Sequence, residues 1–160
     1  MSKLILEVKN LNTSFSNDSH ETAILKDISF QLHRGEILGF FGLVGAGRSE
    51  VMRTIFGIDK KDAGEVLIDG KLLKGSNPKL SMKSGIAFVP EDRQSQGVIL
   101  EQSLTRNITL PLIDDISKFG MVKVKKEKEL TSTYGQMMEI RAAGWHVNAE
   151  TLSGGNQQKV

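Results

Sequence analysis

An apolar run that turns directly into a glycine-rich loop constrains the fold of this chain more than any other feature. Residues 37–41 read Ile-Leu-Gly-Phe-Phe, residues 42–49 read Gly-Leu-Val-Gly-Ala-Gly-Arg-Ser, and a helical pattern follows. A short apolar run predicts a strand that is buried on both faces, as in a parallel sheet. A strand, a glycine-rich loop and a helix in this order are typical of an α/β phosphate-binding unit.

The loop matches the pattern G-x-x-x-x-G-[K]-[ST] at every fixed position but one. Its glycines let the backbone curl so that successive N–H groups point inward, and this nest, together with the helix N-terminus, holds anionic phosphates. The Ser49 hydroxyl is placed to ligate Mg²⁺. The candidate binding residues are Gly42, Gly45, Ala46, Gly47, Arg48, Ser49 and Glu50. The alternative is a glycine-rich turn without a ligand.

The one departure is Arg48, which stands where the pattern has lysine. A lysine ammonium is a compact point charge, whereas a guanidinium is planar and larger, so it must reorient or displace something near the phosphates. We therefore expect phosphate binding to survive, and hydrolysis at this loop to be weakened or lost.

Hydrophobic periodicity predicts the remaining elements. We expect strands at 4–8, 28–32 and 65–69, a second buried strand at 86–89, a loop at 10–19, and helices after the phosphate loop and at 78–83, 103–110 and 123–141. Gly57 ends the first helix, and Pro111 ends the third. This order predicts the α/β class: a parallel-sheet core, an antiparallel β layer before it and a helical subdomain after it.

Composition excludes several function classes. The 160 residues include 21 Lys and Arg and 19 Asp and Glu, which gives a net charge of +2. This small charge disfavours a nucleic-acid-binding protein. There is no cysteine, so disulfides, zinc–thiolate sites and thiol nucleophiles are excluded. We find no signal peptide and no membrane-spanning run, so we expect a cytoplasmic location, with any membrane association made through a partner.

A second motif, Leu-Ser-Gly-Gly-Asn-Gln-Gln-Lys at 152–159, carries a family resemblance. It resembles the LSGGQ-type signature of ABC-transporter ATPases, in the NQQK variant of bacterial simple-sugar importers. The loop GLVGAGRSE and the stretch FVPEDRQSQGVIL resemble the second, C-terminal ATPase domain of those importers, with PEDR in the place of the Q-loop. The resemblance covers nearly the whole chain. The resemblance implies a P-loop NTPase core and ATP with Mg²⁺ as the direct ligand.

The resemblance also implies roles for residues outside the loop. Phe15 stands where such ATPases stack an aromatic ring on adenine; the alternative is a core phenylalanine at a strand end. Glu91 takes the place of a glutamine that ligates Mg²⁺ and transmits the nucleotide state; the alternative is a solvated loop acid. Arg93 could face the membrane subunit. Ser153, Gly154 and Gly155 would close over the γ-phosphate held by a second ATPase domain, paired head to tail.

The same resemblance implies partners and a division of the chain. The partners are the second ATPase domain and a transmembrane permease that holds the protein at the inner face of the membrane; the sugar binds elsewhere. We expect a nucleotide-binding core at 1–90, a Q-loop-like segment and helical subdomain at 91–152, and the start of the signature helix at 153–160, where the domain is truncated.

No residue of the chain matches the family's catalytic carboxylate or its later histidine, because His20, His33 and His146 all precede the signature. We therefore assign no catalytic residue and expect the chain alone to be inactive, marginally stable and prone to self-association. Two other functions stay open. One is a regulatory or scaffold domain that binds ATP without hydrolysing it. The other is an ABC protein of DNA repair or translation, against which the NQQK and PEDR motifs argue.

Overall fold

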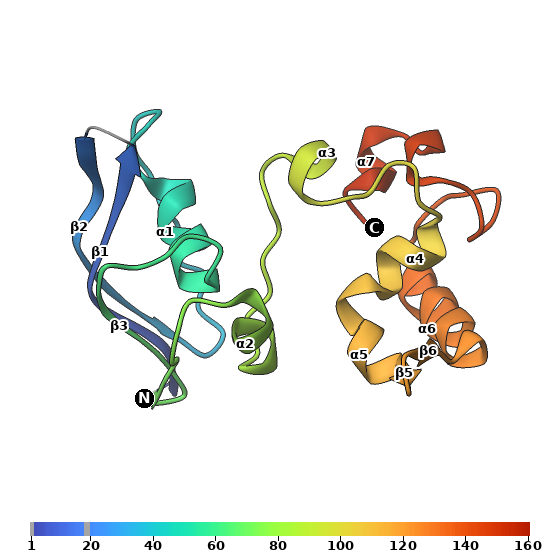
Figure 1. The fold of residues 1–160 in the computed structure, drawn as a ribbon, viewed down its shortest axis with the longest axis horizontal. Helices are drawn as coiled ribbons and strands as arrows, with labels where there is room; N and C mark the ends of the chain where they lie inside the picture. Colours follow the sequence, from blue (N-terminus) through green and yellow to red (C-terminus); the bar gives the residue numbers. More distant parts are fainter. Residues whose placement is uncertain (1, 18–19) are drawn as a thin grey trace. The chain divides into compact units, whose positions relative to one another are not determined.

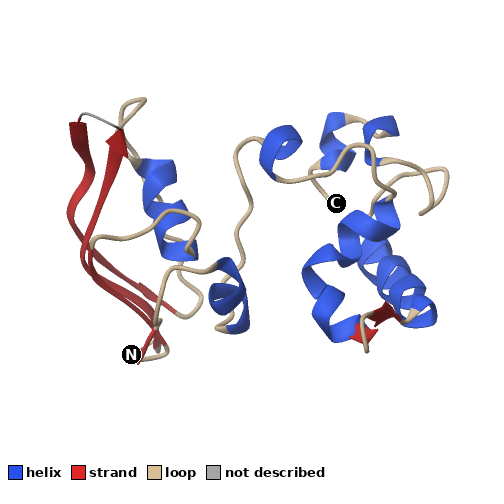
Figure 2. Ribbon diagram, in the orientation of Figure 1, coloured by secondary structure: helices blue, strands red, loops and turns tan. Residues whose placement is uncertain are grey.

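The computed structural model describes residues 2–17 and 20–160. The chain divides into two compact units, Met1–Phe88 and Val89–Val160, and each has a hydrophobic core of its own. Figure 1 shows the course of the chain through both units, and Figure 2 shows that the long strands belong to the first unit and most of the helices to the second.

The first unit is built on an antiparallel sheet of four strands in the order β2-β1-β3-β4. Its strands are β1 (Leu4–Asn17), β2 (His20–His33), β3 (Ala63–Ile68) and β4 (Lys71–Leu72). The predicted loop at 10–19 is therefore wrong up to Asn17, and residues 18–19 lie outside the described part of the chain. This sheet is the antiparallel layer that the sequence predicts.

A bulge in β1 explains why its second half was predicted as a loop. Asn10 has a positive φ of 47°, and the pairing with β2 shifts register between Val8 and Leu11. The extra residue turns both Val8 and Leu11 into the core, where they are 1% and 0% exposed. Strict alternation of inward and outward side chains is lost there, so the strand pattern disappears from the sequence.

Helix α1 (Arg48–Phe56) packs its Val51 and Ile55 side chains into the core of this unit. The helix ends at Gly57, as predicted, in a left-handed conformation with φ 87°. Helix α2 (Pro78–Lys83) starts at the predicted Asn77–Pro78 turn. Both helices lie on the same side of the sheet (Figure 1).

A partly buried ion pair fixes the end of α1. The Arg53 guanidinium donates to both carboxylate oxygens of Asp59, at 2.8 and 2.9 Å, and the Asp59 side chain is only 7% exposed. The hydrogen bond to Asp59 raises the pKa of Arg53 above its ordinary value. These two hydrogen bonds hold the backbone that follows α1 against the last turn of the helix.

Two predicted strands are absent from the described structure. Residues 37–41 and 86–89 belong to no strand, and Ile37 and Phe41 are 97% and 102% exposed. A strand buried on both faces needs hydrogen-bonded neighbours and covering layers. No described strand pairs with either run, so the observed sheet is antiparallel only.

The second unit is mainly helical. Its elements are α3 (Arg93–Gln96), α4 (Leu104–Thr109), η1 (Leu110–Leu112), α5 (Ile113–Ile116), β5 (Ser117–Lys118), β6 (Met121–Val122), α6 (Val124–Met137), η2 (Ala149–Thr151) and α7 (Gly154–Gln157). Helices α4 and α6 pack together, beside a core of Leu104, Ile140 and Ala149. Among the described residues, no helix is both long and apolar enough to cross a bilayer.

One boundary in this unit agrees with the prediction and one differs from it. Helix α4 ends at Thr109, before Pro111 as predicted, and Pro111 lies near the start of the 3₁₀ turn η1, where its missing N–H costs nothing. Helix α6 ends at Met137 rather than at 141, because Glu139 takes a positive φ of 52°. Met137 and Met138, which the helical pattern placed in the core, are 75% and 48% exposed.

Candidate functional site

The glycine-rich loop at 42–49 forms a tight turn that ends on helix α1. The Ala46 amide donates to the Leu43 carbonyl at 3.1 Å and closes the turn. Gly45 and Gly47 have φ of 82° and 81°, in the left-handed region that side chains disfavour. Gly47 is the N-cap of α1, so the chain passes from the turn directly into the first helical turn.

Two further glycine positions are set by close contacts. A Cβ on Gly42 would lie 3.1 Å from the Cβ of Ala46, so the loop folds tightly on itself. A Cβ on Gly47 would lie 3.0 Å from a methyl carbon of Leu25, so the loop is packed against β2. Strand β2 of the sheet thus supports the loop.

The side chains at the start of α1 face solvent. Arg48 and Ser49 are exposed, and Glu50 is half-buried. The first N–H groups of a helix have no acceptor within the helix, and together with the helix dipole they favour an anion there. Arg48 adds the loop's only cationic side chain. Glu50 adds a negative charge within the same first turn, and this charge repels an anionic ligand.

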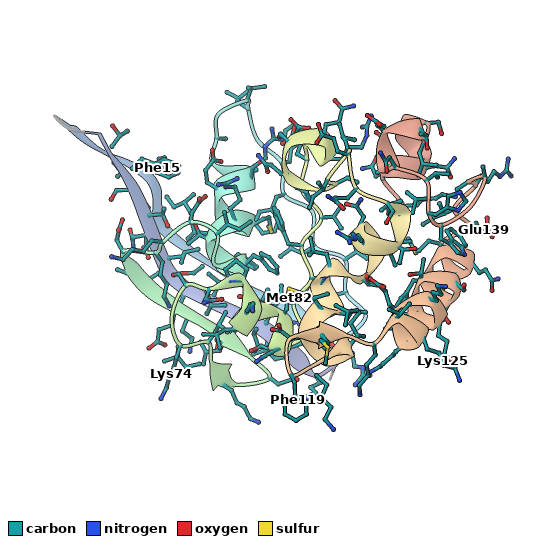
Figure 3. The ribbon with its side chains drawn as sticks, turned by 45° about the vertical axis from the view of Figure 1, so that its right-hand side comes forward. Phe15, Lys74, Met82, Phe119, Lys125 and Glu139 are labelled. Atoms are coloured by element: carbon teal, nitrogen blue, oxygen red, sulfur yellow. The ribbon has the colours of Figure 1, made fainter. Side chains whose placement is uncertain are left out.

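Phe15 lies near the end of β1 in the same unit (Figure 3). It pairs with Thr22 of β2, and the residue is 46% exposed. The ring is not a member of the buried core cluster. An exposed aromatic face can take a planar base by stacking, without specific hydrogen bonds.

The PEDR segment opens the second unit, where Asp92 caps the single-turn helix α3. Its carboxylate accepts from the Gln94 and Ser95 amides at 3.0 and 3.3 Å and from the Ser95 hydroxyl at 2.8 Å. Hydrogen bonds from Ser95 and Gln94 lower the pKa of Asp92 below its ordinary value. Glu91, the predicted metal ligand, is exposed at the start of this segment.

The signature at 152–159 is held by its own polar side chains. Asn156 accepts from the Arg141 amide at 3.0 Å and donates to the Ser153 hydroxyl at 3.2 Å. Gln157 donates to the Ala149 carbonyl at 3.1 Å. Lys159 donates to the Glu139 carbonyl at 3.1 Å. The side chains that distinguish this signature, Asn156, Gln157 and Lys159, therefore hold it to the rest of the helical unit by hydrogen bonds.

The structure brings the predicted residues together in two groups. The loop residues 42–50 and Phe15 belong to the first unit, and Glu91 and the signature residues 153–155 to the second. Arg93, which the sequence suggested could face a membrane subunit, contacts Gly154 and Gln157 of the signature. No sequence signal indicated this contact, because Arg93 and Gln157 are 64 residues apart.

Within the described ranges there is no cluster of three or more histidine or acidic side chains that could hold a metal alone. A divalent cation here would need oxygens from its ligand. Mg²⁺ commonly binds in this way, with few protein ligands and several phosphate or water oxygens.

A comparison with known protein families shows to which family this chain belongs. The family model described as ABC transporter matches residues 25–160. The chain belongs to the ABC transporter family. Its match covers the loop, the PEDR segment and the signature.

Curated relatives of this ABC chain carry a common name. The ribose import ATP-binding protein RbsA of Lacticaseibacillus paracasei is 47% identical over 155 residues, which are 97% of this chain and 29% of that protein. The protein of the same name from Rhodococcus jostii is 41% identical over 98% of this chain and 30% of its own length. The chain thus spans about three tenths of the length of these relatives.

Solved structures confirm the fold class. The dimeric, ADP- and Pi-bound ATP-binding cassette MJ0796 has a TM-score of 0.77 at 23% identity, covering 97% of this chain and 66% of that one. A second dimeric structure of MJ0796 gives 0.75 at 25% identity. The ABC chain is an α/β protein of this cassette fold, and the missing parallel pairing at 37–41 and 86–89 is a local difference from the prediction.

Proposed function

We propose that this chain is the nucleotide-binding part of the ATP-binding subunit of an importer for ribose or a related simple sugar. The full protein would couple ATP binding and hydrolysis to uptake. The observation that carries the proposal is the loop at 42–49, whose two left-handed glycines lead into the exposed N-terminus of α1. The names of the relatives at 41–48% identity support the sugar.

The loop residues suit a triphosphate in three ways. The N–H groups at the start of α1 and the Arg48 guanidinium offer donors and positive charge to phosphate oxygens. Ser49 lies in the exposed first turn, and its hydroxyl would serve as an oxygen ligand for Mg²⁺. The half-exposed Phe15 ring would stack on the base. When bound, MgATP supplies the phosphoryl group whose transfer to water releases the free energy for transport.

The proposed partners are a second ATPase domain and a membrane permease. In a head-to-tail pair, Ser153, Gly154 and Gly155 would meet the γ-phosphate held by the other domain's loop. Glu91, exposed ahead of the α3 cap, would offer its carboxylate to Mg²⁺ or respond to the nucleotide. The permease would hold the protein at the membrane, and it would carry the sugar.

An experiment on uptake tests the proposed function. In cells whose only copy of the full-length protein carries Ser49→Ala, we expect uptake of labelled ribose or a related sugar to fall by at least about tenfold, because the ligand set of Mg²⁺ is incomplete. Ser132→Ala on α6 is the matched control and should leave uptake unchanged. Normal uptake by the Ser49→Ala cells, for every simple sugar tested, would contradict the proposal.

Arg48 favours a second, narrower possibility, that this domain binds ATP without hydrolysing it and completes the site of its partner. On this reading Arg48→Lys leaves the ATPase rate of the full-length protein nearly unchanged. Ser153→Ala lowers that rate by about 100-fold, as for the loss of one donor to developing charge. A rate that depends on Arg48 and not on Ser153 would contradict the asymmetry.

A further inference from the structure

The side chain of Arg93 lies against the backbone of the signature. A Cβ on Gly154 would stand 2.7 Å from a terminal nitrogen of the Arg93 guanidinium and 3.4 Å from its central carbon. A side chain at 154 would displace the guanidinium from this place. The first residue of helix α7 is thus covered by the PEDR arginine, on the side where any other residue would carry its side chain.

A second contact joins Arg93 to the interior of the same unit. Its Nε donates to the Gln157 amide oxygen at 3.5 Å, and the Gln157 amide nitrogen donates to the Ala149 carbonyl at 3.1 Å. Gln157 is only 6% exposed. Because both ends of this buried amide are engaged, its orientation is set, and Arg93 is linked through it to η2.

The backbone of Arg93 is itself held in place. Its carbonyl accepts from the amides of Gly97 and Val98 at 3.0 and 2.8 Å, and Asp92 caps the helix from the other side. A Cβ on Gly97 would lie 3.0 Å from the Arg93 carbonyl oxygen, so this turn is tightly closed. A rigid backbone lets the side chain transmit position rather than merely fill space.

Helix α7 depends on such contacts, because it has only four residues. A single helical turn is unstable by itself, so its direction is set by what it touches. We propose that Arg93 is a positioning residue, which orients the signature turn at 153–155 and couples it to the PEDR segment that begins near Glu91. The functional part of this inference rests on the proposed function; the structural part does not.

The chemistry of arginine suits this position better than lysine. A planar guanidinium can lie flat on the Gly154 backbone while its Nε donates to Gln157. A lysine ammonium is a point charge and can make one of these contacts at a time. Arg93→Lys should therefore keep part of the coupling, and Arg93→Ala should lose it.

The test is amide hydrogen exchange in the full-length protein without nucleotide. The Gln157 and Gln158 amides donate to the Ser153 and Gly154 carbonyls at 2.9 and 3.1 Å, so their exchange reports on the signature turn. We expect Arg93→Ala to speed this exchange by about tenfold, with Arg93→Lys between it and the wild type. The matched control is Arg106→Ala, whose guanidinium donates to Gln102 at 3.5 Å; it should leave both amides unchanged.

The functional readout separates positioning from loss of structure. Arg93→Ala should lower the kcat for ATP by about tenfold, as for a small misplacement of a reacting group, while the KM stays within about twofold. Unchanged exchange at 157 and 158 would overturn the proposal, and so would faster exchange throughout both units, which would mean general destabilisation.

Failure of the proposed function is seen separately. It would appear as no protection of the amides at 45–50 by MgATP in the wild type. In that case the exchange comparison between Arg93→Ala and Arg106→Ala alone decides the positioning role.

Discussion

At the scale of single residues, Gly135 shows how packing can reverse an intrinsic preference. It lies within helix α6 and is buried, and a Cβ there would stand 2.4, 2.7 and 2.9 Å from three carbons of the Trp145 ring. Helix propensity alone favours alanine over glycine by about 1 kcal/mol. The rigid indole cannot move aside as a flexible chain end would, so glycine is required here.

We therefore predict that Gly135→Ala lowers the free energy of unfolding by about 1–3 kcal/mol, the usual cost of overpacking. Urea denaturation followed by fluorescence measures it directly, because Trp145 is the only tryptophan. Gly39→Ala is the control, since no atom lies within 4 Å of a Cβ at that position. A variant at 135 that is as stable as the wild type would show that the indole packs elsewhere.

Asp92 offers a residue-scale test that depends on pH. Hydrogen bonds from Ser95, first from its hydroxyl and then from its amide, hold the pKa of Asp92 below its ordinary value of 3.8. Because the folded pKa is depressed, the cap's contribution is complete above the ordinary pKa and is lost as the pH falls through the folded pKa.

Removing the Ser95 hydroxyl should raise the pKa of Asp92. We expect an NMR titration of the Asp92 carboxyl to give a higher midpoint in Ser95→Ala than in the wild type, with α3 losing its amide protection at a correspondingly higher pH. Ser132→Ala should leave the midpoint where it is. An identical midpoint in Ser95→Ala would mean that the hydroxyl does not bond to the carboxylate in solution.

At the scale of elements, the phosphate loop contains two left-handed glycines with different surroundings. Gly45 has no atom within 4 Å of an added Cβ, whereas Gly47 has the Leu25 methyl at 3.0 Å. A side chain at either position costs about 1 kcal/mol in backbone strain. Only at Gly47 does it also push the loop away from β2.

Gly47→Ala should therefore weaken nucleotide binding more than Gly45→Ala, by about tenfold in Kd, because α1 and the loop must shift together. Equilibrium binding of a fluorescent ATP analogue to the two variants, side by side, measures the difference. An equal loss of affinity in the two variants would show that backbone strain alone weakens binding, and that the contact with Leu25 does not contribute.

Local signals predicted elements well where they act within a few residues. The end of α1 at Gly57 and the start of α2 at Asn77–Pro78 depend on adjacent residues only, and both are confirmed. The second half of β1 could not be predicted, because the bulge at Asn10 breaks the alternation on which the pattern depends. The runs at 37–41 and 86–89 have strand-like composition, but a strand exists only with partners.

The candidate site shows the same division. The loop residues could be predicted because a contiguous motif carries the geometry, and the left-handed Gly45 and Gly47 agree with it. The hydrogen bond between Arg93 and Gln157 could not be predicted, because it joins two motifs that lie far apart in the sequence. The roles of Phe15 and Glu91 stay predictions, since each was assigned by resemblance alone.

At the scale of the whole molecule, exposed apolar side chains are concentrated before and within the loop. Ile37, Phe41, Leu43 and Val44 are 97%, 102%, 85% and 98% exposed. Exposed apolar side chains that gather on a protein surface mark a contact surface or an aggregation hazard. It belongs to one short segment, so its effect can be tested by substitution.

We predict that the 160-residue chain self-associates with rising concentration, and that the double substitution Ile37→Ser and Phe41→Ser reduces this. Sedimentation velocity over a range of concentrations measures it. Phe119→Ser, which removes the ring of an 89% exposed residue between β5 and β6, is the control and should change little. A wild-type chain that stays monomeric at all concentrations would contradict this prediction and would mean that the apolar side chains of 37–44 are buried in solution.

The most direct test of triphosphate binding at the loop 42–49 is a titration of MgATP into this chain, followed through its backbone amide signals in NMR. We predict that the amides at 45–49 shift saturably with MgATP, and much less with AMP, which lacks the β- and γ-phosphates. A well-dispersed spectrum in which these amides do not respond to MgATP would contradict phosphate binding at 42–49, because the chain would then be folded and its loop unable to hold a triphosphate.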